Sequence, residues 1–140
     1  MLDVGHLMRG GCMIFALHLH KRSRLPLFGL MDENGRIHHA GVGEAGAELL
    51  FDGRGKSYRD DFAYWRGQPC AGDRLEAVTA AEIKAVLNEE RLPIYSRQAM
   101  DAYMQRNSSL FAQMPILPEP ERPRPAAKPK QILGLMTRAR

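Results

Sequence analysis

The sequence predicts an α+β fold for residues 1–112, with an N-terminal helix packed on a small antiparallel sheet, followed by an extended tail over residues 113–140. Three observations lead to this prediction. An apolar run of helical character follows Gly10-Gly11. The dipeptide Asn34-Gly35, a strong hairpin signal, separates two apolar segments. Six of the nine prolines fall between residues 115 and 129, and such a composition favours extended conformations over packing.

The first expected helix runs from Gly11 to about Arg22. Its residues from Met13 to Leu17 are all apolar, which indicates a helix that is mostly buried. Basic residues near its end suit the negative pole of the helix dipole, and Pro26 prevents the helix from continuing.

Three antiparallel strands are expected next, joined in sequence order. The segments Leu25–Met31 and Arg36–Val42 flank the Asn34-Gly35 turn and form the first hairpin. Glycines from Gly43 to Gly46 provide a second turn, and a third strand follows over Ala47–Asp52.

The remaining elements of the domain are mostly C-terminal helices. Thr79 and Glu82 have the spacing of a capping box, which starts a helix that ends near Arg91. Pro93 breaks this helix, and Ser96 can cap a last helix to about Arg106. Between the three strands and these helices we expect a short helix over Ser57–Trp65 and a further strand over Arg74–Val78.

The composition excludes several classes of protein. No apolar run approaches the roughly 20 residues needed to cross a bilayer, so we expect no membrane association. The first ten residues lack the apolar stretch of a secretion signal, which favours a cytoplasmic protein, or one carried in a phage particle. The two cysteines, Cys12 and Cys70, are too few for a disulfide-stapled domain and are expected to be free thiols.

The tail carries the whole net charge of +4. Residues 1–112 hold 14 basic and 14 acidic side chains, whereas residues 113–140 hold six basic and two acidic ones. Nucleic-acid binding is therefore conceivable only through the tail. A small apolar cluster among these basic residues is typical of a peptide that docks on a protein partner, with contacts expected from Ile132, Leu133, Leu135 and Met136.

A possible catalytic group lies between residues 12 and 52. Cys12 starts a helix, and the N-terminal end of a helix lowers the pKa of a thiol. An imidazole at position 38 or 39 lies on a predicted strand, and Asp52 ends the next strand. A thiol, an imidazole and a carboxylate on neighbouring elements can serve as nucleophile, base and orienting group. The sequence around Cys12 is equally compatible with an ordinary core residue, because cysteine is often buried as a small hydrophobic side chain.

These residues resemble the core of papain-like cysteine hydrolases, in particular small bacterial and phage-associated members. The resemblance rests on Gly11-Cys12 opening a helix, on His39-Ala40-Gly41-Val42 in a strand, and on Phe51-Asp52-Gly53-Arg54-Gly55. It covers about residues 10–55. The superfamily includes peptidases, cell-wall amidases, deamidases and acyltransferases. The resemblance implies that Cys12 is the nucleophile, His39 the base and Asp52 the orienting group.

Two points of this site are left open by the sequence. Strand alternation is expected to place His38 and His39 on opposite faces, so that only one of them meets Cys12, and a register slip would exchange them. The oxyanion donor is expected to be the backbone N–H of Cys12 or the side chain of His6. The histidines and Cys12 have no standard metal-ligand spacing, so we expect neither metal nor cofactor.

Two functions from different classes follow. The first is a thiol hydrolase or acyltransferase that acts on an amide or ester bond, or an inactive descendant of one. The second is a non-catalytic interaction or structural protein that joins a larger assembly through residues 113–140. One form of this second hypothesis is that the protein is encoded by a phage.

Overall fold

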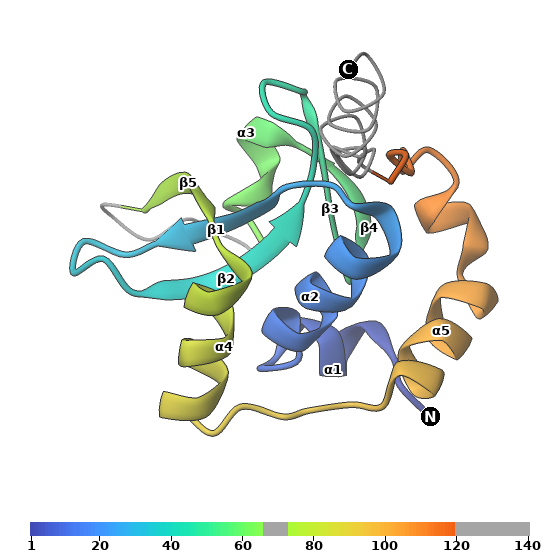
Figure 1. The fold of residues 1–140 in the computed structure, drawn as a ribbon, viewed down its shortest axis with the longest axis horizontal. Helices are drawn as coiled ribbons and strands as arrows, with labels where there is room; N and C mark the ends of the chain where they lie inside the picture. Colours follow the sequence, from blue (N-terminus) through green and yellow to red (C-terminus); the bar gives the residue numbers. More distant parts are fainter. Residues whose placement is uncertain (66–72, 120–140) are drawn as a thin grey trace, which may run out of the picture.

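A five-stranded antiparallel sheet organises residues 1–65 and 73–119, the part of the chain that the computed structural model describes (Figure 1). The strand order is β4-β3-β2-β1-β5, and every neighbouring pair is antiparallel. The predicted α+β class with an antiparallel sheet is confirmed. The strands are β1 (Leu27–Met31), β2 (Ile37–Val42), β3 (Leu49–Asp52), β4 (Gly55–Tyr58) and β5 (Arg74–Val78).

The β1–β2 hairpin forms where Asn34-Gly35 predicts it. One carboxylate oxygen of Asp32 accepts hydrogen bonds from the backbone N–H groups of Asn34 and Arg36, at 2.8 and 3.0 Å. Gly35 has a φ of 77°, which side chains rarely adopt, so glycine is strongly favoured there. The local sequence therefore fixes this turn.

Helix α2 (Cys12–Ser23) packs against β2 and agrees with the predicted helix to within one residue at each end. It lies between the sheet and α5 (Arg97–Arg106), with α4 (Ala80–Glu89) on the same side (Figure 1). The main apolar core fills this space. The predicted capping box of α4 is confirmed, because Thr79 and Glu82 bond each other's backbone N–H groups.

A smaller apolar cluster forms around Phe62, at the end of α3 (Arg59–Phe62). It contains Phe28, Leu30 and Leu50, the residues of β1 and β3 whose side chains alternate with those of the main core. The predicted helix over Ser57–Trp65 is wrong in its extent. Ser57 and Tyr58 belong to β4, because the turn after Asp52 returns the chain alongside β3.

Three elements were missed by the sequence interpretation. They are α1 (Val4–Met8), strand β4, and a short 3-10 helix, η1 (Ser108–Phe111). Helix α1 is only five residues long and is stabilised by a capping box between Asp3 and His6. Beyond η1 the chain still packs on the core, since the N–H of Leu117 donates to the carbonyl of Ser23 at 2.8 Å.

The predicted docking residues Ile132, Leu133, Leu135 and Met136 lie outside the described residues, as does Cys70. Within the described ranges, none of the helices is both long and apolar enough to cross a membrane.

Candidate active site

Cys12 begins α2 at a point where the chain passes very close to α1. The N–H of Gly11 donates to the carbonyl of His6 at 3.1 Å. A Cβ atom on Gly11 would lie 2.4 Å from this same oxygen and 2.8 Å from the Tyr95 ring, so only glycine fits. The tight packing around Gly11 fixes the start of α2 relative to α1.

Burial raises the pKa of Cys12 to about 12. The side chain is 5% exposed and belongs to the main apolar core. The backbone N–H of Ala40 lowers the pKa and the charge of Asp52 raises it, both by less than burial does. The low thiol pKa predicted from the helix N-terminus is therefore wrong, because the loss of hydration outweighs the nearby amides.

His39 and Asp52 form a buried hydrogen bond between β2 and β3. His39 Nε2 lies 2.8 Å from Asp52 Oδ2, and the two residues are 0% and 2% exposed. Two neighbouring strands thus bring together the imidazole and the carboxylate.

Arg54 holds Asp52 in place and keeps it ionised. Its Nη2 lies 2.8 Å from Asp52 Oδ2, and its backbone N–H donates to Oδ1 at 2.9 Å. Burial alone would raise the pKa of Asp52, but the hydrogen bonds from His39 and Arg54 and their charges outweigh burial and lower it. Asp52 is therefore a carboxylate at neutral pH.

The charge of Asp52 determines the tautomer of His39. Burial lowers the pKa of His39 in spite of the opposing effect of Asp52, so the ring is neutral at pH 7. Because a carboxylate only accepts hydrogen bonds, the proton of the neutral ring must be on Nε2. Nδ1 then carries a lone pair, and it is buried without a hydrogen-bond partner in the described part of the chain. This is the atom that a general base would use.

A β-bulge places both histidines beside the same tryptophan. Leu30 pairs with His39 and Met31 pairs with Ile37, so His38 is the extra residue. The His39 ring stacks on Trp65 with a centroid distance of 4.6 Å, and the His38 ring lies 6.0 Å from it. The prediction of opposite faces is wrong, because the bulge interrupts the alternation. His38 binds a different carboxylate, that of Asp73, at 3.0 Å.

The structure brings Cys12 next to β2 but does not join it to His39. The amide of Ala40 is near enough to act on the thiol, whereas the His39 ring packs against Phe62 and Trp65. Since Nδ1 of His39 has no partner among residues 1–65 and 73–119, the hydrogen bond between thiol and imidazole is not formed. The pair His39–Asp52 is therefore assembled, but the His39 ring packs against the Phe62 cluster, on the face of the sheet opposite to the main core that contains Cys12.

Comparison of the chain with protein-family models, with curated proteins and with solved structures finds no significant match. The site must therefore be interpreted from its own geometry.

Sequence reasoning missed Arg54 and Trp65 as parts of this site. Arg54 could have been found from its position two residues after Asp52, with only a glycine between them. Trp65 packs against the Phe62 cluster and stacks on the His39 ring. Nothing in the sequence places Trp65 near β2, because that contact depends on how α3 folds back.

The two expected oxyanion donors, His6 and the N–H of Cys12, differ in the structure. His6 uses its Nδ1 to accept the backbone N–H of Asp3 at 3.2 Å and so caps α1. The N–H of Cys12 belongs to the first turn of α2, where backbone donors lack partners within the helix. No group of three or more His, Cys, Asp or Glu side chains in the described residues is arranged to hold a metal ion.

Acidification below about pH 6.5 is expected to reduce the stability of the fold. Burial lowers the pKa of both His18 and His39 from the ordinary value of 6.5. The unfolded chain therefore binds protons that the folded chain does not, and the free energy of unfolding falls as the pH falls. Urea unfolding at pH 7.5 and 5.5 measures this difference. An equal free energy at the two pH values would contradict neutral, buried imidazoles.

Proposed function

We propose that the protein is a thiol hydrolase or acyltransferase that acts on an amide or ester bond through Cys12, His39 and Asp52. The observation that carries this proposal is the state of the His39 ring, which donates Nε2–H to a fixed carboxylate and keeps a buried, unpartnered lone pair on Nδ1. Within the described residues, His38 also has an unpartnered buried Nδ1 and a carboxylate on Nε2. His39 is distinguished by the complete burial of its pair with Asp52 and by the contact of Arg54 with that carboxylate.

The electrostatics favour a neutral resting pair over a thiolate–imidazolium ion pair. Burial raises the pKa of Cys12 to about 12 and lowers the pKa of His39. Proton transfer must then accompany attack on the substrate. As Sγ bonds to the carbonyl carbon, Nδ1 takes the thiol proton, and Asp52 stabilises the imidazolium that forms.

The rest of the reaction uses the same groups. The N–H groups of the first turn of α2 can donate to the oxyanion of the tetrahedral intermediate. The imidazolium then returns its proton to the leaving amine or alcohol, which leaves an acyl group on Cys12. Attack by water, with His39 as base, completes hydrolysis, whereas attack by an amine or alcohol completes acyl transfer.

Substrate access requires a movement around the Gly10-Gly11 turn. Tyr95 packs directly on Gly11, and His6 accepts the Gly11 N–H, so these residues cover the start of α2. We expect a substrate to displace this cover. The reaction further requires that the His39 ring leave its packing on Phe62 and Trp65, so that Nδ1 and Sγ come within hydrogen-bond distance across the edge of the sheet. In the absence of substrate the thiol should be protected.

An acyl-enzyme assay tests the proposal. The chain with Cys70→Ala is incubated with p-nitrophenyl acetate, and the acetylated residue is identified by mass spectrometry. We expect acetylation of Cys12, slowed by at least about a hundredfold in His39→Gln, because a general base contributes factors of this size. Circular dichroism checks that the variant is folded.

The control for the base is His38→Gln, because His38 neighbours the same tryptophan but binds a different carboxylate. Its acetylation rate should stay close to that of the parent. Equal rates in the parent and in a folded His39→Gln chain would overturn the proposal and would favour the non-catalytic hypothesis.

A further inference from the structure

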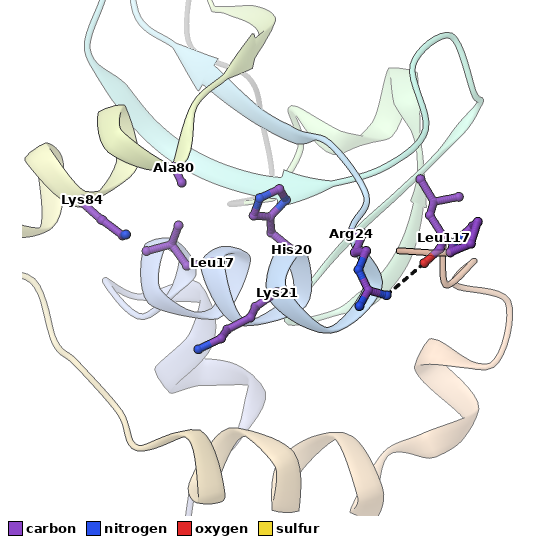
Figure 2. Close-up of a pocket in the computed structure, with 8 residues that line it drawn as sticks. Leu17, His20, Lys21, Arg24, Ala80, Lys84 and Leu117 are labelled. Atoms are coloured by element: carbon purple, nitrogen blue, oxygen red, sulfur yellow. Dashed lines mark hydrogen bonds between the residues drawn. The ribbon is translucent and has the colours of Figure 1, made fainter. Parts of the chain in front are cut away.

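A basic groove lies between α2 and α4, away from the candidate active site (Figure 2). Its volume is about 640 Å³. It is formed by the second half of α2, the first turns of α4, and the chain where it passes Ser23. The lining residues are Leu17, His20, Lys21, Arg24, Ala80, Lys84, Leu117 and Pro118. Lys21 lies nine residues after Cys12 in α2, a rise of about 14 Å along the helix axis.

The charge of the groove is one-sided. Its lining includes Lys21, Arg24 and Lys84 but no acidic side chain. Figure 2 shows Lys21 and Lys84 extending from different helices on either side of Leu17. Neither lysine forms an ion pair with any residue in the described ranges. Two unpaired ammonium groups beside an apolar surface favour a ligand that is both acidic and apolar.

The chain itself shows how one end of the groove holds a peptide. The N–H of Leu117 donates to the carbonyl of Ser23 at 2.8 Å, and Arg24 Nη1 donates to the carbonyl of Leu117 at 3.2 Å. The carboxylate of Glu119 lies 4.0 Å from Arg24 Nη2. Arg24 thus binds a main-chain carbonyl and lies near a carboxylate, whereas Lys21 and Lys84 have no carboxylate partner in the described residues.

We propose that this α2–α4 groove binds an acidic peptide segment of another protein, with an aliphatic side chain over Leu17 and carboxylates on Lys21 and Lys84. The protein's own tail is a poor occupant, because residues 120–140 contain six basic residues and one acidic residue. Like charges would oppose its docking beside the two lysines.

Fluorescence anisotropy of the full-length chain with a labelled peptide, Glu-Leu-Pro-Glu-Leu-Glu, tests the proposal. We expect saturable binding that weakens as salt increases. The double variant Lys21→Gln/Lys84→Gln should weaken binding by about tenfold, the effect of two exposed charge contacts. The matched control is Lys56→Gln, an exposed lysine on β4 that bonds Gln113, and its affinity should be unchanged.

Two further probes define the ligand. A peptide with Gln in place of Glu should not bind, and dodecanoate tests whether a small amphiphile is preferred. Equal affinity of the parent chain and the folded double variant would overturn the proposal. Binding of dodecanoate without binding of the acidic peptide would also overturn it, because the groove would then accept a small anion and not a protein segment.

Discussion

Replacing Asp52 by asparagine is expected to lower the free energy of unfolding by about 3 kcal/mol, because it breaks a buried ion pair on one side only. Asp52 accepts hydrogen bonds from His39 and from the side chain and backbone of Arg54. An amide of the same size removes the charge that Arg54 faces. The loss should fall at the low end of the usual range for buried pairs, since the Arg54 side chain is 26% exposed and can be partly hydrated.

Urea unfolding of Asp52→Asn and of Asp60→Asn measures this effect with a matched substitution. Asp60 is an exposed carboxylate in the first turn of α3, and we expect its loss to cost less than about 1 kcal/mol. Similar losses in the two variants would contradict a structural ion pair at Asp52. The same Asp52→Asn chain should also lose acetylation of Cys12, because Asp52 stabilises the imidazolium in the proposed reaction.

The sequence predicts those parts of the fold that local chemistry determines. Asn34-Gly35 defines a hairpin through its own backbone preferences, and Thr79 with Glu82 starts a helix through bonds within four residues. These predictions require no knowledge of distant contacts. The contact between His39 and Asp52 could also be predicted from the sequence, because consecutive strands of an antiparallel sheet often lie side by side.

The parts that failed depend on distant contacts. The bulge at His38 arises from the register between β1 and β2, which no residue of β2 specifies alone. The burial of Cys12 depends on the main apolar core, to which α4 and α5, far along the chain, contribute. A helix N-terminus predicts a low thiol pKa only when the thiol remains hydrated, and hydration is a property of the whole fold.

The pH dependence of Cys12 acetylation should separate a neutral pair from an ion pair. With His39 as base, the rate rises as the imidazole loses its proton. The pKa of His39 lies below 6.5, so the rate should reach a plateau by about pH 7 and stay flat to pH 9. An ion pair would instead hold a reactive thiolate already at acidic pH.

The His39→Gln chain should behave differently, because only the free thiolate can then react. With a thiol pKa of about 12, roughly one thiol in ten thousand is ionised at pH 8, and the rate should rise about tenfold for each pH unit. The ratio of parent to variant rates is thus expected to be largest near pH 7 and to shrink steadily as the pH rises. Parallel profiles, both rising to pH 9, would mean that His39 takes no proton from Cys12. A parent rate that is flat while the variant rate climbs can arise only if the imidazole, and not the solvent, deprotonates the thiol.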